Sequence, residues 1–413
     1  MFLNSYKYNK FDVYIFVMLA SLTSGDLLGA LQIPRVLALL FFIPFVKSIH
    51  SADCELNQMK KWTGVFLTFS FFSSLWNPAG IIESLIASTY NLVHVILFLE
   101  IIFFSRFAEN PIKSIIYGIL VTFLISAAIA FWEITTDYHL STSRMEEAYE
   151  SNTGFEVYLR KFTSVTFFNF NAYVTFLCYL LPFLFYGFFS KQNNLKIRII
   201  FLASTLIAIV LILYNGSRGG LLSFVIMFTV YITLSKKNKA NVFFIIFFLS
   251  LLTIVLYSYG STIFNALLMR ASVQGALEEE SRIVIWTNVY KVIQDYCFIG
   301  CGAGGLMSAM EDYAQGGILK AHNIFLEVLS EYGIVFFILF VSFLISQYKK
   351  ARKMDDRERK LCLFQALIAF PVIGIINSGY QTQPALWAFL AVIYVFANYE
   401  QIRLSCEDLC ITA

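Results

Sequence analysis

KAHNIFLEVLSEYG, residues 320–333, is the stretch on which the interpretation of this chain depends. Its hydrophobic residues lead directly into an apolar run at 335–345, and a helix that spans a bilayer needs about 20 such residues. The stretch also carries four polar or ionisable side chains: His322, Asn323, Glu327 and Glu331. Ionisable groups inside a membrane helix are costly and usually face a cavity or a partner. The stretch therefore predicts a membrane helix with a site at its start.

The composition extends the membrane interpretation to the whole chain. Of the 413 residues, 58% are hydrophobic and 14% are charged, whereas soluble domains carry roughly 25% charged residues. The mean hydropathy is +0.70. The net charge of +3 is too small to indicate a nucleic-acid partner. About twelve apolar runs are candidates for membrane helices. They centre near Met18, Leu40, Phe69, Val93, Phe123, Leu177, Ile207, Met227, Ser250, Phe337, Ala369 and Ile393.

The basic residues predict the topology. They cluster in the even-numbered connections, for example at 47–61, 191–198 and 349–360, and short basic loops mark the cytoplasmic side. We therefore expect an all-α polytopic protein with both termini in the cytoplasm and a single integral membrane domain over residues 1–413. Two long connections are then external, 135–164 and 261–321. We expect the second, between spans nine and ten, to be a partly helical loop.

The polar residues of the opening stretch suggest a site at the external membrane face. His322 is the one histidine of four that has several polar neighbours at a junction between a loop and a span. Asn323 is a good helix cap, and a helix N-terminus suits an anion. Glu327 and Glu331 share the face of Asn323. They support a site or pair with arginines to hold helices together, and His322 itself could be an interfacial structural residue.

Two further motifs fall at the same predicted face. In YNGSRGGLLSF, residues 214–224, Ser217 can cap the next helix and Arg218 occupies its first turn. Arg218 either binds a phosphate with its planar fork or pairs with a glutamate. In TFFNFNAYVTFL, residues 166–177, Asn169 and Asn171 could contact sugar hydroxyls or cap the helix.

The external loop 261–321 carries the remaining candidates. Arg282 and Trp286 lie on a pattern typical of an amphipathic helix at the membrane surface, and Arg270 precedes them. The glycines at 300–305 predict a turn that returns the chain toward the opening stretch, since no βαβ pattern surrounds them. Cys297 and Cys301 share this loop and could form a disulfide, although we interpret them as unpaired. No nucleotide, haem, iron–sulfur or metal motif is present, so no cofactor or metal is expected.

These elements, in this order, resemble those of the bacterial O-antigen polymerase and O-antigen ligase superfamily. The family pattern has an NxN-like element, an SRG turn, two loop arginines with a nearby Trp, a GxG turn and an HN motif. The HN motif is His, then Asn, Ser or Gln, nine residues, Gly, two residues, and Gly, Thr or Tyr. Here it reads His322, Asn323, Gly333 and Phe336, so the last position departs from the pattern while keeping an aromatic ring.

The resemblance implies a glycosyltransferase of the GT-C-like class in the bacterial inner membrane, with a periplasmic active site. Its donor would be a glycan on undecaprenyl pyrophosphate, and the reaction would be inverting and independent of metal. His322 would be the catalytic base. Cations would stabilise the pyrophosphate: Arg218, Arg282 and Arg270. The supporting residues would be Asn323, Glu327, Ser217 and Asn171.

We interpret the chain as an O-antigen or surface polysaccharide polymerase of lipopolysaccharide biosynthesis, because the external loop has few basic residues for docking an anionic core. A chain-length regulator is a possible partner. The alternatives are an O-antigen ligase that transfers the glycan to lipid A–core, and a protein O-oligosaccharyltransferase. Outside the family, a lipid-glycan transporter or flippase would place its ionisable residues near the bilayer midplane instead.

Overall fold

The structure is a computed structural model that describes residues 8–49, 54–140, 142, 162–234, 275–314 and 319–411. Within these ranges every regular element is helical, so the predicted all-α class is confirmed for them. The α-helices are α1 (Lys10–Ala20), α2 (Ile33–Ile49), α3 (Cys54–Phe72), α4 (Ile81–Phe107), α5 (Pro111–Thr136), α7 (Phe170–Phe189), α8 (Leu195–Tyr214), α9 (Arg218–Leu234), α11 (Gly275–Asp295), α12 (Leu306–Ala314), α13 (Ile324–Lys353), α14 (Arg357–Ile373) and α15 (Pro384–Ile411).

Six of the described helices are long and apolar enough to cross a membrane: α4, α5, α7, α8, α13 and α15. The predicted run near Ser250 lies outside the described residues, and each of the other predicted centres lies in a helix. Helix α1 has 11 residues and would reach about 16 Å, which is short for a bilayer. The structure thus supports a protein with several membrane helices, and the number twelve stays a prediction.

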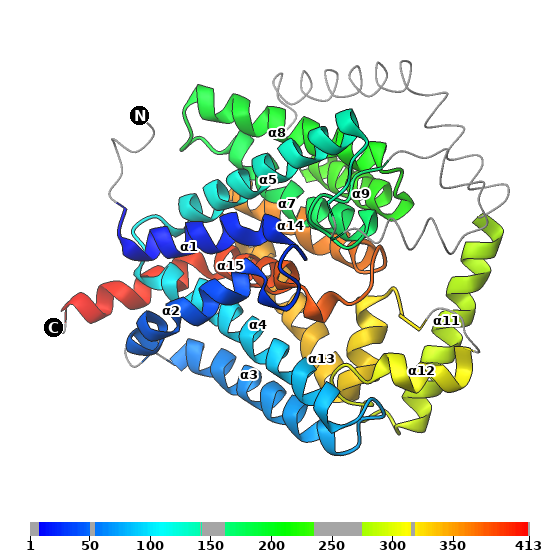
Figure 1. Ribbon diagram of the computed structural model, residues 1–413. Coiled ribbons are helices and arrows are strands. Elements are labelled where there is room, and N and C mark those ends of the chain that lie inside the picture. The colour runs from blue at the N-terminus through cyan, green and yellow to red at the C-terminus, as the bar shows by residue number, and fades with distance from the viewer. Residues whose placement is uncertain are drawn as a thin grey trace.

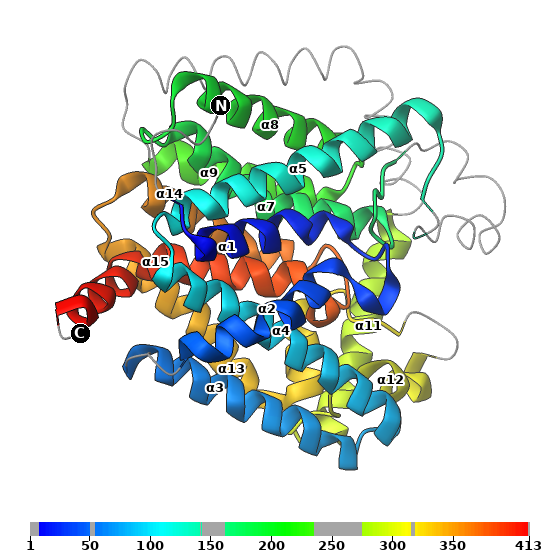
Figure 2. The ribbon, with the colours of Figure 1, turned by 60° about the vertical axis from the view of Figure 1, so that its left-hand side comes forward.

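Helix α7 forms the centre of the bundle, with 89% of its most apolar window buried inside the protein. Figures 1 and 2 show α7 among α5, α8, α14 and α15. Aromatic side chains join it to α15, with ring centroids 4.5 Å apart for Tyr179 and Phe389 and 5.1 Å apart for Phe183 and Phe396. Helix α13 is peripheral, with 22% of its window buried, which leaves its flank open to lipid.

Contacts between helix ends divide those ends into two groups. At one end of the bundle Asn9 Nδ2 donates to the carbonyl of Phe107 at 2.7 Å, and Arg359 pairs with Glu400 at 2.7 Å. This end carries the described basic connections, the start of α1 and the end of α15, which lie on the left of Figure 1. The starts of α7, α9, α13 and α15 gather at the opposite end. The alternation of basic connections along the sequence agrees with this grouping.

Two helices lie within the predicted loop 261–321, namely α11 and α12, on the right of Figure 1. The apolar face of α11 packs against α12 and Ala321: Ile285, Val289, Val292 and Ile293 are buried in one cluster with Leu306 and Met310. The amphipathic pattern is therefore real, but this face is covered by the protein itself. Cys297 and Cys301 are both free thiols, as interpreted from the sequence. Arg270 and most of 135–164 lie outside the described residues.

Candidate functional site

The HN segment opens α13 as its sequence predicts. Asn323 caps the helix, because its Oδ1 accepts hydrogen bonds from the N–H groups of Phe325 at 3.0 Å and Leu326 at 3.4 Å. The preceding residue, His322, has a left-handed backbone with φ of 47°, which residues other than glycine rarely adopt. Trp286 of α11 donates from Nε1 to the carbonyl of Ala321 at 2.9 Å. The loop helix therefore fixes the backbone beside His322.

His322 is half-buried beside two cations, and this environment sets its charge. Burial, then the positive charges of Arg282 and Lys320, lowers the pKa of His322 to about 4. The imidazole is therefore neutral at physiological pH and available to accept a proton. It makes no hydrogen bond with any residue that the structure describes. Arg282 and Trp286 are one turn apart on α11, so a single helix supplies a cation and the backbone contact.

Lys320 is a candidate that the sequence interpretation missed. Its Nζ lies 5.5 Å from the ring centroid of Phe168, the residue before the NxN element. This contact brings the HN segment next to the start of α7, although more than a hundred residues separate them in the sequence. The only signal in the sequence was its position two residues before His322, and the family pattern gives that position no role.

The NxN and SRG elements meet at the starts of α7 and α9. Asn169 caps α7 by accepting from the N–H of Ala172 at 2.8 Å. Ser217 accepts from the N–H of Gly220 at 3.4 Å, which confirms its predicted role as the cap of α9. The Ser217 hydroxyl also donates to Oδ1 of Asn171 at 3.4 Å. Arg218 follows with an exposed side chain in the first turn of α9, at the same end of the bundle as the HN segment.

A second missed element is the connection between α14 and α15, here called the 374–383 loop. It contacts each of the three helices that carry motifs. The N–H of Ile324 in α13 donates to the carbonyl of Gly374 at 2.8 Å. In α9, Gly219 packs against Ile376, and a Cβ added to Gly219 would lie 2.8 Å from Cγ1 of Ile376. Before α7, Nδ2 of Asn169 donates to Oδ1 of Asn377 at 3.4 Å. The loop therefore joins the NxN, SRG and HN elements.

Glu327 holds the same loop. Its carboxylate is buried and accepts hydrogen bonds from the backbone N–H groups of Gly379 at 2.8 Å and Tyr380 at 3.1 Å. Neither of the partners considered from the sequence, an arginine or His322, hydrogen-bonds to it among the described residues. Glu327 lies one turn after Asn323 on α13, where the loop presents two backbone N–H groups. The two oxygens of the carboxylate accept these two donors, so the loop takes the place of the expected partners.

The glycine of the HN pattern, Gly333, lies where the glycine turn at 300–305 and the residues before it pack against α13. The Glu331 carboxylate accepts from the N–H of Gly304 at 3.1 Å, and its carbonyl accepts from the N–H of Gly302 at 3.0 Å. At Gly333 the backbone leaves the helix, with φ of 77° and ψ of −179°. A Cβ there would lie 2.1 Å from the carbonyl oxygen of Ile299. The pattern's glycine thus breaks α13 into residues 324–332 and 334–353 and lets the turn dock.

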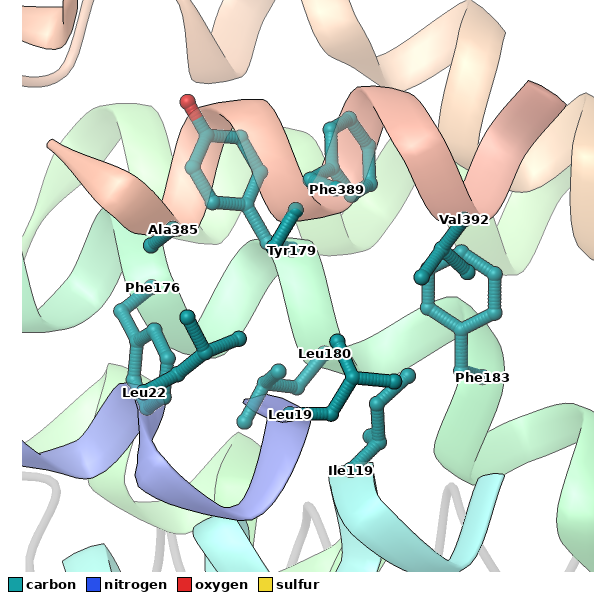
Figure 3. A pocket seen from close by; sticks show the side chains of 11 residues that line it. Leu19, Leu22, Ile119, Phe176, Tyr179, Leu180, Phe183, Ala385, Phe389 and Val392 are labelled. Carbon is teal, nitrogen blue, oxygen red and sulfur yellow. The ribbon is translucent and has the colours of Figure 1, made fainter. Parts of the chain in front are cut away.

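A small cavity and a larger groove lie among the described helices. A cavity of about 10 Å³ in the bundle core, drawn in Figure 3, is lined by apolar side chains such as Leu19, Phe176 and Phe389 and holds no more than a water. A groove of about 780 Å³ runs between α3 and the second segment of α13. Its lining includes Phe69, Phe72, Phe298, Ile299, Val335 and Phe336, with Lys60 and Lys61 toward the basic end.

Comparison with known proteins agrees with the motif pattern. Residues 203–341 match the family described as O-antigen ligase, a range that includes the SRG and HN elements and ends before the 374–383 loop. The teichuronic acid biosynthesis protein TuaE of Bacillus subtilis strain 168 is 26% identical over 372 residues, which cover 83% of this chain and 74% of the relative. Both matches support the resemblance to the O-antigen ligase and polymerase superfamily that the motifs carry.

Proposed function

We propose that the chain is a membrane glycosyltransferase of polysaccharide biosynthesis, a polymerase that joins glycan repeat units carried on undecaprenyl pyrophosphate. The observation that carries the proposal is a neutral histidine, His322, beside the cations Arg282 and Lys320 at the start of a membrane helix. This arrangement pairs a proton acceptor with a binding place for a diphosphate. TuaE acts by its name in teichuronic acid biosynthesis, so the proposed product is a surface polysaccharide, with O antigen as one example.

The proposed reaction is a single displacement at the anomeric carbon. His322 takes the proton of the acceptor hydroxyl, whose oxygen forms the new glycosidic bond as the bond to the pyrophosphate oxygen breaks. The electron pair of the broken bond stays with the departing polyprenyl pyrophosphate. Arg282, Arg218 and Arg270 stabilise that growing charge. The bound donor also offsets the cations beside His322, which strengthens the imidazole as a base in the complex.

The proposed setting completes the topology. We place the site at the periplasmic face of the inner membrane, with twelve spans, both termini in the cytoplasm, external loops at 135–164 and 261–321, and a GT-C-like fold over residues 1–413. The grouping of basic connections at one end and motif residues at the other supports this orientation. The groove beside α13 is the proposed place of the polyprenyl tail, because its lining is mostly apolar and it lies against α13, whose apolar window is only 22% buried.

The decisive test replaces His322 by Ala and measures glycan chain length in a strain that lacks the native gene. We expect polymer to be lost. Arg282→Ala should give the same result, whereas Arg352→Ala, at the basic end of α13, should leave the polymer at full length. Full-length polymer from the His322 variant would remove this residue from catalysis.

A ligase is the second candidate, because the matched family is described as O-antigen ligase. The same strain separates the two functions by the glycan that remains on the acceptor. Loss of a polymerase leaves an acceptor that bears one repeat unit, whereas loss of a ligase leaves a bare acceptor. A bare acceptor in the His322→Ala strain would therefore replace polymerase by ligase.

A further inference from the structure

We propose that Glu327 and the 374–383 loop form a positioning element that fixes the HN, SRG and NxN elements relative to one another. The proposal rests on the proposed function only in its kinetic consequence, since the contacts themselves need no substrate. Glu327 acts as a positioning residue in this proposal, because the hydrogen bonds of its carboxylate among the described residues come from the loop backbone.

The hold of Glu327 on the loop is strong and specific. Its side chain is 5% exposed, and both carboxylate oxygens accept backbone N–H groups, from Gly379 and Tyr380. Hydrogen bonds to charged or buried groups are costly to break, because a buried donor without a partner is left behind. The loop backbone at Gly379 is left-handed, with φ of 67°, which presents the two N–H groups to the same side chain.

The interior of the loop is itself fixed. The Tyr380 side chain is fully buried, and its hydroxyl donates to the carbonyl of Ile373 at 2.8 Å and accepts from the N–H of Asn377 at 2.8 Å. These two bonds close the loop on itself. A displacement of Gly379 should therefore also displace Asn377, whose Oδ1 accepts a hydrogen bond from Nδ2 of Asn169 in the NxN element at 3.4 Å.

The loop then sets the spacing of the candidate cations and the base. Its Gly374 carbonyl accepts the first N–H of α13, two residues after His322, and its Ile376 packs on Gly219, one residue after Arg218. An added Cβ on Gly219 would lie 2.8 Å from Cγ1 of Ile376, so α9 and the loop are closely packed at this point. A misplacement of about 1 Å between reacting groups can cost about a hundredfold in rate. Loosening the loop should therefore reduce turnover without removing any group that touches substrate.

The first experiment measures geometry without activity. Cysteines replace Asn169 and Asn377 in a chain whose seven native cysteines have been removed, and copper phenanthroline forms the cross-link in native membranes. Glu327→Gln keeps the shape of the side chain but replaces one of the two acceptor oxygens by an NH2 group, which can only donate. We expect this change to slow cross-linking about tenfold, which corresponds to about 1.4 kcal/mol. Glu331→Gln is the matched control, because its carboxylate contacts the glycine turn instead, and it should leave the rate unchanged.

The second experiment measures turnover with polyprenyl-linked donor in proteoliposomes. We expect Glu327→Gln and Tyr380→Phe each to lower kcat by roughly 10–100-fold while the donor KM changes less, and the double variant to be no worse than the poorer single one. Glu327→Asp keeps both acceptor oxygens and should restore part of the rate. If Glu327→Gln fails to fold, Tyr380→Phe tests the same loop.

The two experiments separate the two proposals. Equal cross-linking rates in the parent, Glu327→Gln and Glu331→Gln chains would overturn the positioning proposal, whatever the enzyme does. Slow cross-linking in Glu327→Gln together with full activity of His322→Ala would overturn the proposed function and leave the positioning role of the loop in place. Additive losses of kcat in the double variant would show that Glu327 and Tyr380 act separately, and would also refute the positioning proposal.

Discussion

Replacing Gly333 by Ala tests the break in α13 most directly. The backbone there has φ of 77° and ψ of −179°, a region that is essentially restricted to glycine and costs other residues roughly 1–3 kcal/mol. The new Cβ would also lie 2.1 Å from the carbonyl oxygen of Ile299 and 2.6 Å from that of Phe298. Because both are backbone atoms, no side-chain rotation relieves the contact. We expect a loss of at least about 3 kcal/mol, from the backbone and the steric terms together.

The assay is thermal unfolding of the purified protein in detergent, with the fraction of folded protein followed by size-exclusion chromatography. Gly64→Ala is the matched control, because Gly64 lies within α3 and its added Cβ would meet no atom within 4 Å. Alanine favours a helix over glycine by roughly 1 kcal/mol, so this control should be neutral or stabilising. If Gly333→Ala unfolds at the same temperature as the parent protein, the glycine does not hold the turn against α13.

Three further predictions concern the candidate site. Trp286→Phe removes the hydrogen bond to the carbonyl of Ala321 and should lower kcat about tenfold in a folded protein, measured as turnover; an unchanged rate would show that α11 does not fix His322. The depressed pKa of His322 keeps this side chain neutral down to about pH 4, so if it is the proposed base, kcat/KM should fall only below that pH. Lys320→Gln removes a cation, which raises the pKa of His322 and should move the acid limb of the pH profile to higher pH. An unmoved limb would contradict the assignment of His322 as the base. Val335→Trp should fill the groove beside α13 and raise the KM for long polyprenyl donors but not for short ones, whereas an equal effect on both would place the tail elsewhere.

The linkage of His322 to stability follows from the same pKa. The ordinary pKa is 6.5 and the folded value is about 4, so the unfolded chain binds the proton first as the pH falls. The folded state should therefore lose stability between about pH 6.5 and pH 4, in the opposite sense to a histidine paired with a carboxylate. The test compares the unfolding temperatures of the parent and His322→Asn proteins across this pH range. Parallel curves of unfolding temperature against pH would exclude a contribution of His322 to stability.

Local signals in the sequence predicted local structure well. Asn323 and Ser217 cap their helices because a cap depends on a side chain and the next three residues. The glycine of the HN pattern could be located but not explained, since its reason is the carbonyl of Ile299 on a different segment. The pattern on α11 identified a buried face without showing that α12 covers it.

The 374–383 loop could not have been assigned from the sequence. Glu327 reaches it across 52 residues and binds backbone N–H groups, which every residue except proline offers and which leave no mark in the sequence. A buried glutamate in an apolar run therefore suggested an arginine partner, because charges in membranes usually pair. Lys320 was passed over for a similar reason, since its neighbour Phe168 lies on a distant segment.

The late position of the loop in the chain has a consequence for biosynthesis. The last residue of the motifs to be translated is Phe336, yet the carbonyl that receives the first N–H of α13 belongs to Gly374. At roughly 5–20 residues per second, the 53 residues between Glu327 and Tyr380 take about 3–11 s to synthesise. During that interval the nascent chain carries His322, Arg218 and Arg282 without the segment that we propose aligns them. Under the proposed function, a polypeptide truncated before residue 374 should thus insert and remain inactive, because it lacks the 374–383 loop.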